Sequence, residues 1–315
     1  MNSLLRAVVF LTTGKLLFAL QDVIIKEMSG GYPVHQIVFI RGMVAIPLIL
    51  LIIHFSRGLV IIKGCKVSFH LFRGALMFTA FMAYYLALSE ISLTVATALF
   101  FTAPFFITLL SIPMLGEKVG IRRFMSIFIG FIGVLIVLRP DVNGFGLMGI
   151  LPIVAALFYA CCQLMVRVGN NKDPVSVMTL YASVVFAALG SVTGLVLSQF
   201  EPASDAAVST RFLMQAWSMP QYWDWLFLIF TGVTSGIGFM LSSSAYRAEE
   251  ASKVAPFEYV MMLWVVILSY LVWSEIPDPL TCLGVVIIVS SGVYVLRREK
   301  KVNAKSAAFA GLTRR

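Results

Sequence analysis

Four charged side chains lie inside stretches of sequence that are otherwise almost wholly apolar: Lys15, Asp22, Arg41 and Glu258. A charge in a hydrocarbon environment costs about 3 kcal/mol or more, so each such group needs a partner or a function. Lys15 and Asp22 are seven residues apart, about two helical turns, and therefore share one face of a helix. Their separation of about 10 Å along the helix axis is too long for a direct ion pair.

The expected partner of Asp22 is Arg41, because the two residues lie at similar depth in neighbouring apolar stretches. Two interpretations stay open for this pair: a structural link between two helices, or a gate or substrate-carboxylate clamp that the ion pair occupies when the site is empty. Glu258 either reaches toward Lys253 or binds a proton or ligand in an apolar cavity. Lys15 has no evident acidic neighbour, which favours a substrate that carries a carboxylate or is zwitterionic.

Neutral side chains extend this set of candidates. Gln163 offers hydrogen bonds inside an apolar stretch, and Tyr84, Phe101 and Tyr159 are candidates for the wall of a cavity. Glu117 and its counterpart Glu275 end apolar stretches, which indicates capping and solvation at the membrane surface. Neither the three histidines nor the four cysteines have the spacing of a metal site, so we expect no metal and no cofactor.

The composition indicates an integral membrane protein. Sixty per cent of the residues are apolar and 12% are charged, whereas a soluble domain carries about 25% charged residues. A membrane-spanning helix needs roughly 20 apolar residues. The predicted spans are Leu4–Glu27, Val34–His54, Phe69–Leu88, Leu93–Leu115, Phe124–Leu138, Leu147–Val168, Val175–Gln199, Tyr222–Tyr246, Val254–Trp273 and Leu280–Leu296.

The distribution of lysine and arginine predicts the orientation, because inside loops carry an excess of these residues. With a cytoplasmic N-terminus, the inside of the membrane receives 19 of them and the outside receives three. Both termini are therefore expected in the cytoplasm. Basic inside loops face anionic lipid, which accounts for the net charge of +9 without a nucleic-acid partner.

The chain also resembles itself. Residues from Gly74 to Glu117 match residues from Gly232 to Glu275 at an offset of 158, and residues near the start match at 141. The difference, 158 − 141 = 17, is a longer connection around Phe200–Gln221, part of which we expect to form an interfacial helix.

Ten spans in two repeats give five spans for each repeat. Because five is odd, the second repeat enters the membrane upside down relative to the first, an arrangement that permits alternating access. We predict an all-α membrane protein of ten transmembrane helices in two inverted repeats, residues 1–141 and 142–298, followed by a basic, disordered cytoplasmic tail at residues 299–315.

Three stretches carry a resemblance to a known family: residues 94–104 with Pro104, then Gly116–Glu117–Lys118, then residues 130–137 with Gly130 and Gly133. In these the chain resembles the EamA-type branch of the drug/metabolite transporter superfamily. It departs by placing Pro256 six positions earlier in the aligned span and by replacing Gly116 with Ser274. The resemblance implies secondary transport of a small organic metabolite, proton-linked or by exchange, through a cavity between the repeats.

Two other functional classes compete with a transporter. An accessory membrane protein would bind a partner, but the short loops leave no sizeable extramembrane domain. A membrane-embedded enzyme needs a nucleophile–base set or metal ligands, and His35, His54 and His70 lie near span ends without such partners. We therefore expect a transporter rather than an enzyme, most compatible with a bacterial inner membrane because its loops are compact.

Overall fold

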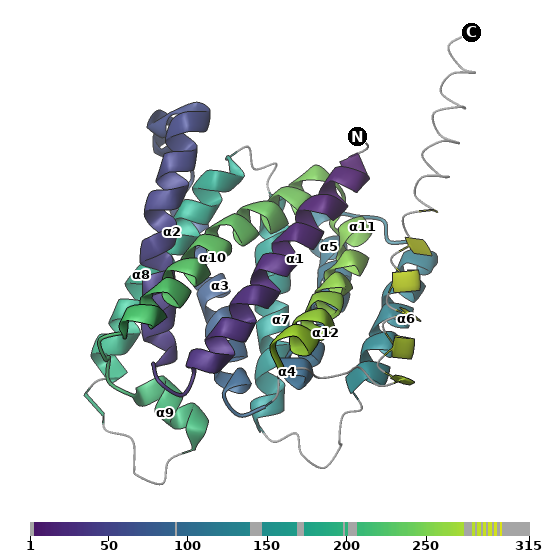
Figure 1. Ribbon diagram of the computed structural model, residues 1–315. Helices are drawn as coiled ribbons and strands as arrows, with labels where there is room; N and C mark the ends of the chain where they lie inside the picture. The colour runs from purple at the N-terminus through teal and green to yellow at the C-terminus, as the bar shows by residue number, and fades with distance from the viewer. Residues whose placement is uncertain are drawn as a thin grey trace.

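The computed structural model describes residues 3–91, 93–138, 147–168, 173–197, 199–200 and 207–273, with short stretches between residues 279 and 297. Within these residues every regular element is a helix (Figure 1). Seven helical segments are long and apolar enough to cross a membrane, and three shorter apolar helices accompany them. The chain is therefore an all-helical membrane protein. The predicted repeat boundary at 141/142, the tail 299–315 and Glu275 lie outside the described residues.

Six predicted spans form long helices that end within a few residues of the predicted bounds. They are α1 (Ser3–Met28), α2 (Val34–Arg57), α3 (Val67–Leu88), α7 (Leu147–Met165), α8 (Val175–Leu197) and α10 (Tyr222–Ala248). The fifth span forms α6 (Ile121–Leu138), and a short apolar helix at Cys282–Ser291 lies within the tenth. A 3₁₀ helix, η1 (Leu59–Gly64), connects α2 to α3.

The fourth and ninth predicted spans are both broken. The fourth consists of α4 (Leu93–Phe100) and α5 (Ala103–Leu115), and the ninth of α11 (Ala251–Val254), the 3₁₀ helix η3 (Ala255–Tyr259) and α12 (Val260–Trp273). Pro104 and Pro256 lie at these breaks. Proline has no N–H to donate and its ring clashes with the preceding turn, which favours a break at these two positions. Other helices of the chain continue through a proline, as α2 does at Pro47 and α7 at Pro152.

The helices pack in interleaved pairs drawn from both halves of the chain. α2 lies against α8, α1 along α10, and α3 along α7, while α10 also packs on α2 and α3 on α8. Glycine permits the closest approaches. A Cβ at Gly42 would lie 2.7 Å from the backbone nitrogen of Ala187, and one at Gly232 would lie 2.5 Å from Cβ of Val44. Small residues at helix crossings serve this purpose in membrane proteins.

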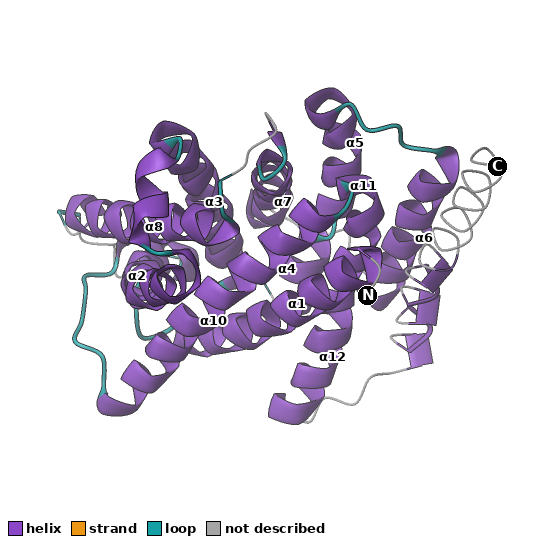
Figure 2. Ribbon diagram, turned by 90° about the horizontal axis from the view of Figure 1, so that it is seen from above, coloured by secondary structure: helices purple, strands orange, loops and turns teal. Residues whose placement is uncertain are grey.

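The bundle has two ends, which we name by their elements. The N-terminal face is the end where α1 begins and η1 lies; the α9 face is the opposite end, where α9 (Val208–Met214) lies (Figure 1). α9 forms inside the connection that the sequence predicted to contain a helix. Seen from above, α6 lies at the opposite side of the bundle from α2 and α8 (Figure 2).

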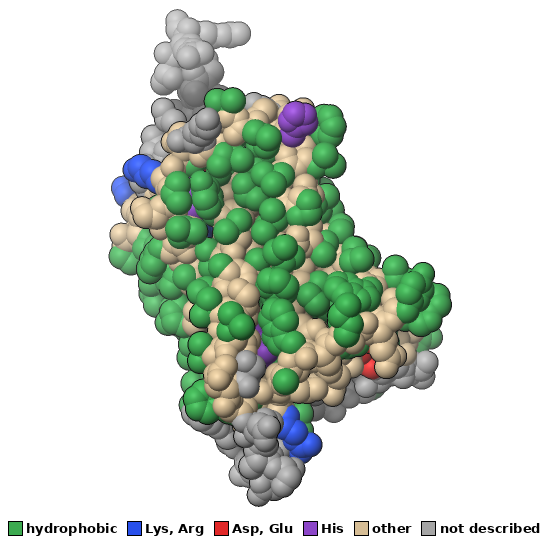
Figure 3. All heavy atoms as spheres, turned by 90° about the vertical axis from the view of Figure 1, so that its left-hand side faces the viewer, with side chains coloured by type: hydrophobic (Ala, Val, Ile, Leu, Met, Phe, Trp, Pro, Cys, Tyr) green, Lys and Arg blue, Asp and Glu red, His purple; other side chains and the backbone are tan. Residues whose placement is uncertain are grey.

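Apolar side chains cover the outside of the bundle. On the side shown in Figure 3, apolar side chains are spread over most of the face. Leu51 and Phe55 of α2 and Val192 and Leu195 of α8 are among the exposed apolar residues. A soluble protein rarely exposes so large an apolar surface. Such a surface is compatible with the hydrocarbon of a membrane. Polar functional groups are therefore expected in the interior of the bundle.

Candidate functional site

A direct ion pair lies at the midpoint of α1. Lys15 occupies the middle of this helix, and its ammonium group pairs with the carboxylate of Glu258 on η3. Both side chains are almost completely buried, with 3% and 2% of their surface exposed. Lys253 does not contact Glu258; it pairs instead with Glu249 and Glu250 at the start of α11. The expectation that Lys15 lacks an acidic neighbour is therefore wrong, because residues 243 positions apart meet here.

Hydrogen bonds complete this pair, and we refer to the whole set as the Lys15–Glu258 cluster. The hydroxyl of Tyr159 accepts bonds from Lys15 (3.0 Å) and from Nε2 of Gln163 (2.6 Å), and it donates to Glu258 (3.1 Å). Tyr246 donates a second bond to Glu258, 2.6 Å long. The cation and the two hydroxyl donors replace most of the hydrogen bonds to water that the Glu258 carboxylate loses on burial, and so offset much of the cost of burying its charge.

Backbone geometry explains why Glu258 can enter the interior. It lies on η3, where Pro256 interrupts the ninth span, and a 3₁₀ turn places successive side chains differently from an α-helix. Broken helices in membrane proteins are tolerated where they line a polar cavity. The charge therefore lies where the membrane helix is least regular.

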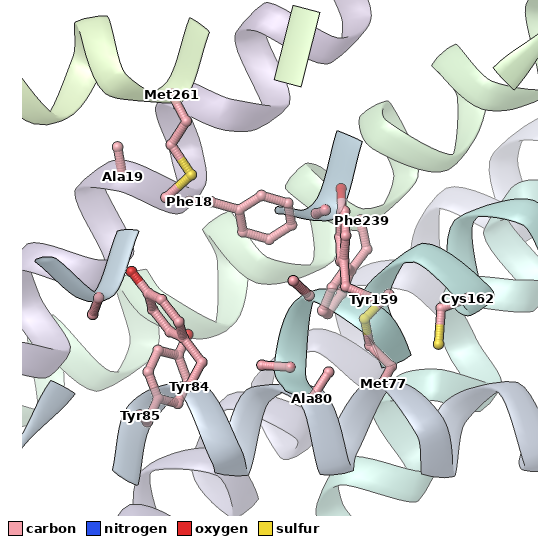
Figure 4. Packing of buried hydrophobic residues seen from close by; sticks show 14 of the residues in the cluster. Phe18, Ala19, Met77, Ala80, Tyr84, Tyr85, Tyr159, Cys162, Phe239 and Met261 are labelled. Carbon is pink, nitrogen blue, oxygen red and sulfur yellow. The ribbon is translucent and has the colours of Figure 1, made fainter. Parts of the chain in front are cut away.

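A cavity lies beside this cluster. Its walls come from α1, α3, α4, α7 and α12, and Figure 4 shows several of them around one space; the lining residues are Lys15, Phe18, Asp22, Ala80, Phe81, Tyr84, Phe100, Tyr159 and Met261. The cavity volume of about 30 Å³ holds about two water molecules at roughly 15 Å³ of such volume for each. A cavity of this volume is too small for a metabolite.

A second group of buried charges, the Asp22–Arg41 cluster, lies on the other side of the cavity. It consists of Gln21, Asp22, Arg41 and Tyr85. Asp22 and Arg41 do not form the predicted direct ion pair among the described residues. The Tyr85 hydroxyl lies between them, accepting a 2.9 Å bond from Nη1 of Arg41 and lying 3.5 Å from Oδ1 of Asp22.

The guanidinium of Arg41 is held mainly by aromatic rings. It lies over Phe81 (4.6 Å to the ring centroid), Phe186 (4.8 Å) and Tyr85 (5.6 Å). The side-chain oxygen of Gln21, oriented toward it, accepts a 3.0 Å bond from Nη1. Within the described part of the chain, Nε and Nη2 of Arg41 have no hydrogen-bond partner. Ring faces stabilise a cation but leave these donors unused.

Of the three aromatic residues predicted to line a cavity, two do so and one does not. Tyr84 and Tyr159 line the cavity, whereas Phe101 is buried against Tyr259, with ring centroids 5.5 Å apart. Phe100, one residue earlier, lines the cavity in its place. The prediction for Phe101 was therefore wrong by one residue, because the break between α4 and α5 decides which ring points inward.

Two residues of the interior were missed by the sequence reasoning. Tyr246 was treated only as the end of a span, and Arg73 was assigned to an inside loop by the charge count. Arg73 is 3% exposed and donates 3.0 Å bonds to the Cys162 carbonyl and to Ser243. The placement of Arg73 within the predicted third span was the available signal.

Glu117 links the two halves of the chain at the N-terminal face. Its carboxylate accepts bonds from the backbone N–H groups of Ala251 (2.8 Å) and Ser252 (3.0 Å) at the start of α11, and from Arg167 (2.7 Å). Gly116, with φ of +66°, makes the left-handed turn that ends α5 and directs Glu117 there. The predicted capping role is therefore present, but Glu117 caps a helix of the other half of the chain.

Nearby, Glu249 accepts bonds from Ser3 at the start of α1 (2.8 Å) and from Lys253 (3.2 Å). Burial alone would raise the pKa of the Glu249 carboxyl, but these bonds hold it below its usual value. The carboxylate therefore stays ionised at neutral pH and ties α1 to the connection between α10 and α11. Among the described residues, no three potential ligands come together as a metal site.

Known proteins with similar sequences are transporters. The chain is 27% identical to a riboflavin transporter of Vibrio cholerae over 97% of this chain and 98% of that protein. It is 23% identical to an S-adenosylmethionine uptake transporter of Rickettsia bellii, covering 90% and 91%. It is 25% identical to the pseudopaline exporter CntI of Pseudomonas aeruginosa, covering 90% and 93%.

A solved protein crystal structure has the same fold, with a TM-score of 0.74 at 15% identity, covering 94% of this chain and 98% of that one. The EamA-like transporter family matches the sequence twice, over residues 5–139 and 145–297. Two matches of similar length account for the self-resemblance of the sequence, and the chain belongs to the EamA-like transporter family.

Proposed function

We propose that this protein is a secondary active transporter that moves a small organic metabolite by alternating access. The observation that carries the proposal is the Lys15–Glu258 ion pair, which lies at the midpoint of α1 beside a small cavity. Binding sites of secondary transporters lie near the bilayer midplane, where helices are discontinuous. The broken spans around Pro104 and Pro256 meet this description.

We further infer that the bundle consists of ten helices in two inverted repeats, residues 1–141 and 142–298. Counterparts in the two repeats touch one another: Phe81 and Phe239 have ring centroids 5.5 Å apart, as have Phe101 and Tyr259. Two residues related by a two-fold rotation can touch only close to the axis. These contacts support an axis that passes through the centre of the bundle.

Helix pairing supports the same arrangement. Under the offsets of 141 and 158, α7 is the counterpart of α1, α8 of α2, and α10 of α3. The α1–α10 contact then corresponds to the α7–α3 contact, and α2–α8 corresponds to itself. Two bundles related in this way can exchange conformations, so that the cavity opens first to one face and then to the other.

In this mechanism Lys15 binds an anionic group of the substrate. The substrate carboxylate replaces Glu258 as the partner of Lys15. Glu258 then either takes up a proton or keeps only its hydrogen bonds from the hydroxyls of Tyr159 and Tyr246. Such a replacement couples transport to a proton or to an exchanged anion. It favours a carboxylate-bearing or zwitterionic substrate, such as an amino acid, an organic acid or a vitamin-like compound.

The proposed location is a bacterial inner membrane with both termini in the cytoplasm. Bacterial relatives and the excess of lysine and arginine on one set of loops support it. The N-terminal face would then be cytoplasmic, and the contacts of Glu117 and Glu249 would hold it closed in the conformation described here.

Counterflow tests this function. Purified protein in liposomes is loaded with one unlabelled metabolite at a time and exposed to its radiolabelled form, using amino acids, organic acids, riboflavin and S-adenosylmethionine. We expect transient accumulation of label for at least one compound, and a proton gradient should change its rate. An accessory protein or an enzyme would give no accumulation with any compound.

A further inference from the structure

The residues that line the cavity indicate more about the substrate than the anionic group that Lys15 would bind. Resting on the proposed transport function, we infer that the substrate also contains a planar aromatic ring system with an N–H or cationic group, which stacks between the cavity walls and donates to Asp22. Three features of the described residues support this inference: the walls, the state of Asp22 and the spacing between Asp22 and Lys15.

Aromatic rings supply most of the cavity walls. Tyr84 and Phe100 contact each other (centroids 5.4 Å apart), and Phe100 contacts Tyr159 (5.3 Å), so the three rings form one continuous surface. Phe18 and Met261, both labelled in Figure 4, line the same cavity. Aromatic rings and a thioether make favourable contacts with a planar π-system. An aliphatic substrate would gain only the burial of its apolar surface.

Asp22 is the acidic group that the cavity leaves least satisfied. Among the described residues, its carboxylate accepts one long hydrogen bond, 3.5 Å from Tyr85, whereas Glu258 accepts bonds from Lys15, Tyr159 and Tyr246. Asp22 is 3% exposed and lines the cavity. A buried carboxylate with spare acceptor sites favours a ligand that presents a donor or a positive charge.

The positions of Lys15 and Asp22 give the order of groups along the substrate. Lys15 and Asp22 lie on the same face of α1, seven residues and therefore about 10 Å apart along the axis. A substrate that reaches both has its anionic group and its N–H or cationic group at opposite ends, with the ring system between them.

Three ring-bearing carboxylates test the inference. Indole-3-acetate has a planar ring with an N–H, naphthalene-1-acetate has a planar ring without one, and cyclohexaneacetate has neither. Binding to the full-length protein in lipid nanodiscs is measured for each by isothermal titration calorimetry. We expect affinity to fall in that order, by about tenfold from the first compound to the last.

Two variants locate the effect. Asp22→Asn should abolish the difference between indole-3-acetate and naphthalene-1-acetate while leaving cyclohexaneacetate within about twofold. Phe100→Leu should weaken both aromatic probes about fivefold, whereas the matched variant Phe105→Leu should not, because Phe105 packs on α6. A purely structural role of Asp22 would weaken all three probes together. Melting temperatures in nanodiscs show whether each variant is folded.

Equal affinity for the three probes, no binding of the aromatic probes, or an unchanged preference in Asp22→Asn would each overturn the inference. The transporter assignment is tested separately, since counterflow of an aliphatic metabolite would support transport while rejecting the aromatic substrate class. Conversely, aromatic binding with the expected order but without any counterflow would reject transport and leave the binding site standing.

Discussion

The two buried charge clusters are built from similar side chains, yet they differ in how completely their charges are compensated. In the Lys15–Glu258 cluster the cation and the carboxylate touch, and two tyrosine hydroxyls donate to the carboxylate. In the Asp22–Arg41 cluster a tyrosine hydroxyl separates the charges, and two guanidinium nitrogens lack partners within the described residues. In the first cluster both charges are paired, and among the described residues only Oε1 of Gln163 lacks a partner. The second cluster retains hydrogen-bonding capacity on its charged groups themselves.

This difference suggests two separate roles. Under the proposed mechanism, the ion pair between α1 and η3 would hold one conformation and would have to break for the bundle to change state. An incomplete cluster beside the cavity can instead gain energy when a ligand arrives. Neither cluster is required by the fold, because the counterparts of Lys15, Arg41 and Glu258 in the other repeat are Ala156, Ala182 and Phe100.

The largest effect is expected from Glu258→Gln. It leaves the buried ammonium of Lys15 without its counter-charge, and removing one partner of a buried pair costs about 3–5 kcal/mol of stability. Counterflow should fall at least a hundredfold because the coupling group is lost. The matched variant Glu250→Gln, on a side chain that is 38% exposed, should behave like the original protein in both assays.

Lys15→Met should reduce transport about tenfold or more and destabilise the protein less than Glu258→Gln does, because the remaining Glu258 carboxyl can be neutralised by a proton. The double variant Lys15→Met/Glu258→Gln removes both charges. The melting temperature of the double variant should be closer to that of the original protein than the melting temperatures of the two single variants are.

Unchanged counterflow in Lys15→Met would contradict the role of this residue in substrate binding. Recovery of both stability and transport in the double variant would mean that the pair is a structural link only.

A smaller effect is expected at the other cluster from Arg41→Lys. The charge is kept, but the fit of a planar guanidinium between Phe81 and Phe186 is lost, together with the bond to Tyr85, at a cost of about 1–3 kcal/mol. Thermal unfolding in nanodiscs measures this change. An increase in stability would show that the unsatisfied nitrogens of Arg41 outweigh its stacking energy.

The smallest effect is expected from Tyr85→Phe, which removes only the hydroxyl between Asp22 and Arg41. The loss of its hydrogen bonds should cost about 1 kcal/mol. Because Asp22 then loses its one bond from a described side chain, its preference for an N–H-bearing probe should rise rather than fall. Calorimetry with indole-3-acetate and naphthalene-1-acetate measures that preference, and a decrease would argue that Tyr85 itself contacts the ligand.

Span positions were predictable because hydrocarbon thickness fixes how many apolar residues a helix needs. Proline alone did not predict the breaks at Pro104 and Pro256, because α2, α5 and α7 continue through Pro47, Pro113 and Pro152. Arg41 was correctly expected near Asp22, because consecutive spans are joined by a short loop. The inserted hydroxyl of Tyr85 was not predictable, because it depends on the rotation of α3 about its axis.

The sequence by itself determined that the chain lies in a membrane, that it contains a duplication and that four charges lie inside its helices. These properties follow from composition and spacing, which act along the chain. Only the tertiary structure decided that Lys15 meets Glu258, that Phe100 rather than Phe101 faces the cavity, and that Glu117 caps α11. Such contacts depend on how helices far apart in the sequence are rotated and packed, and apolar helices in lipid leave many rotations open until small residues and buried polar groups select one.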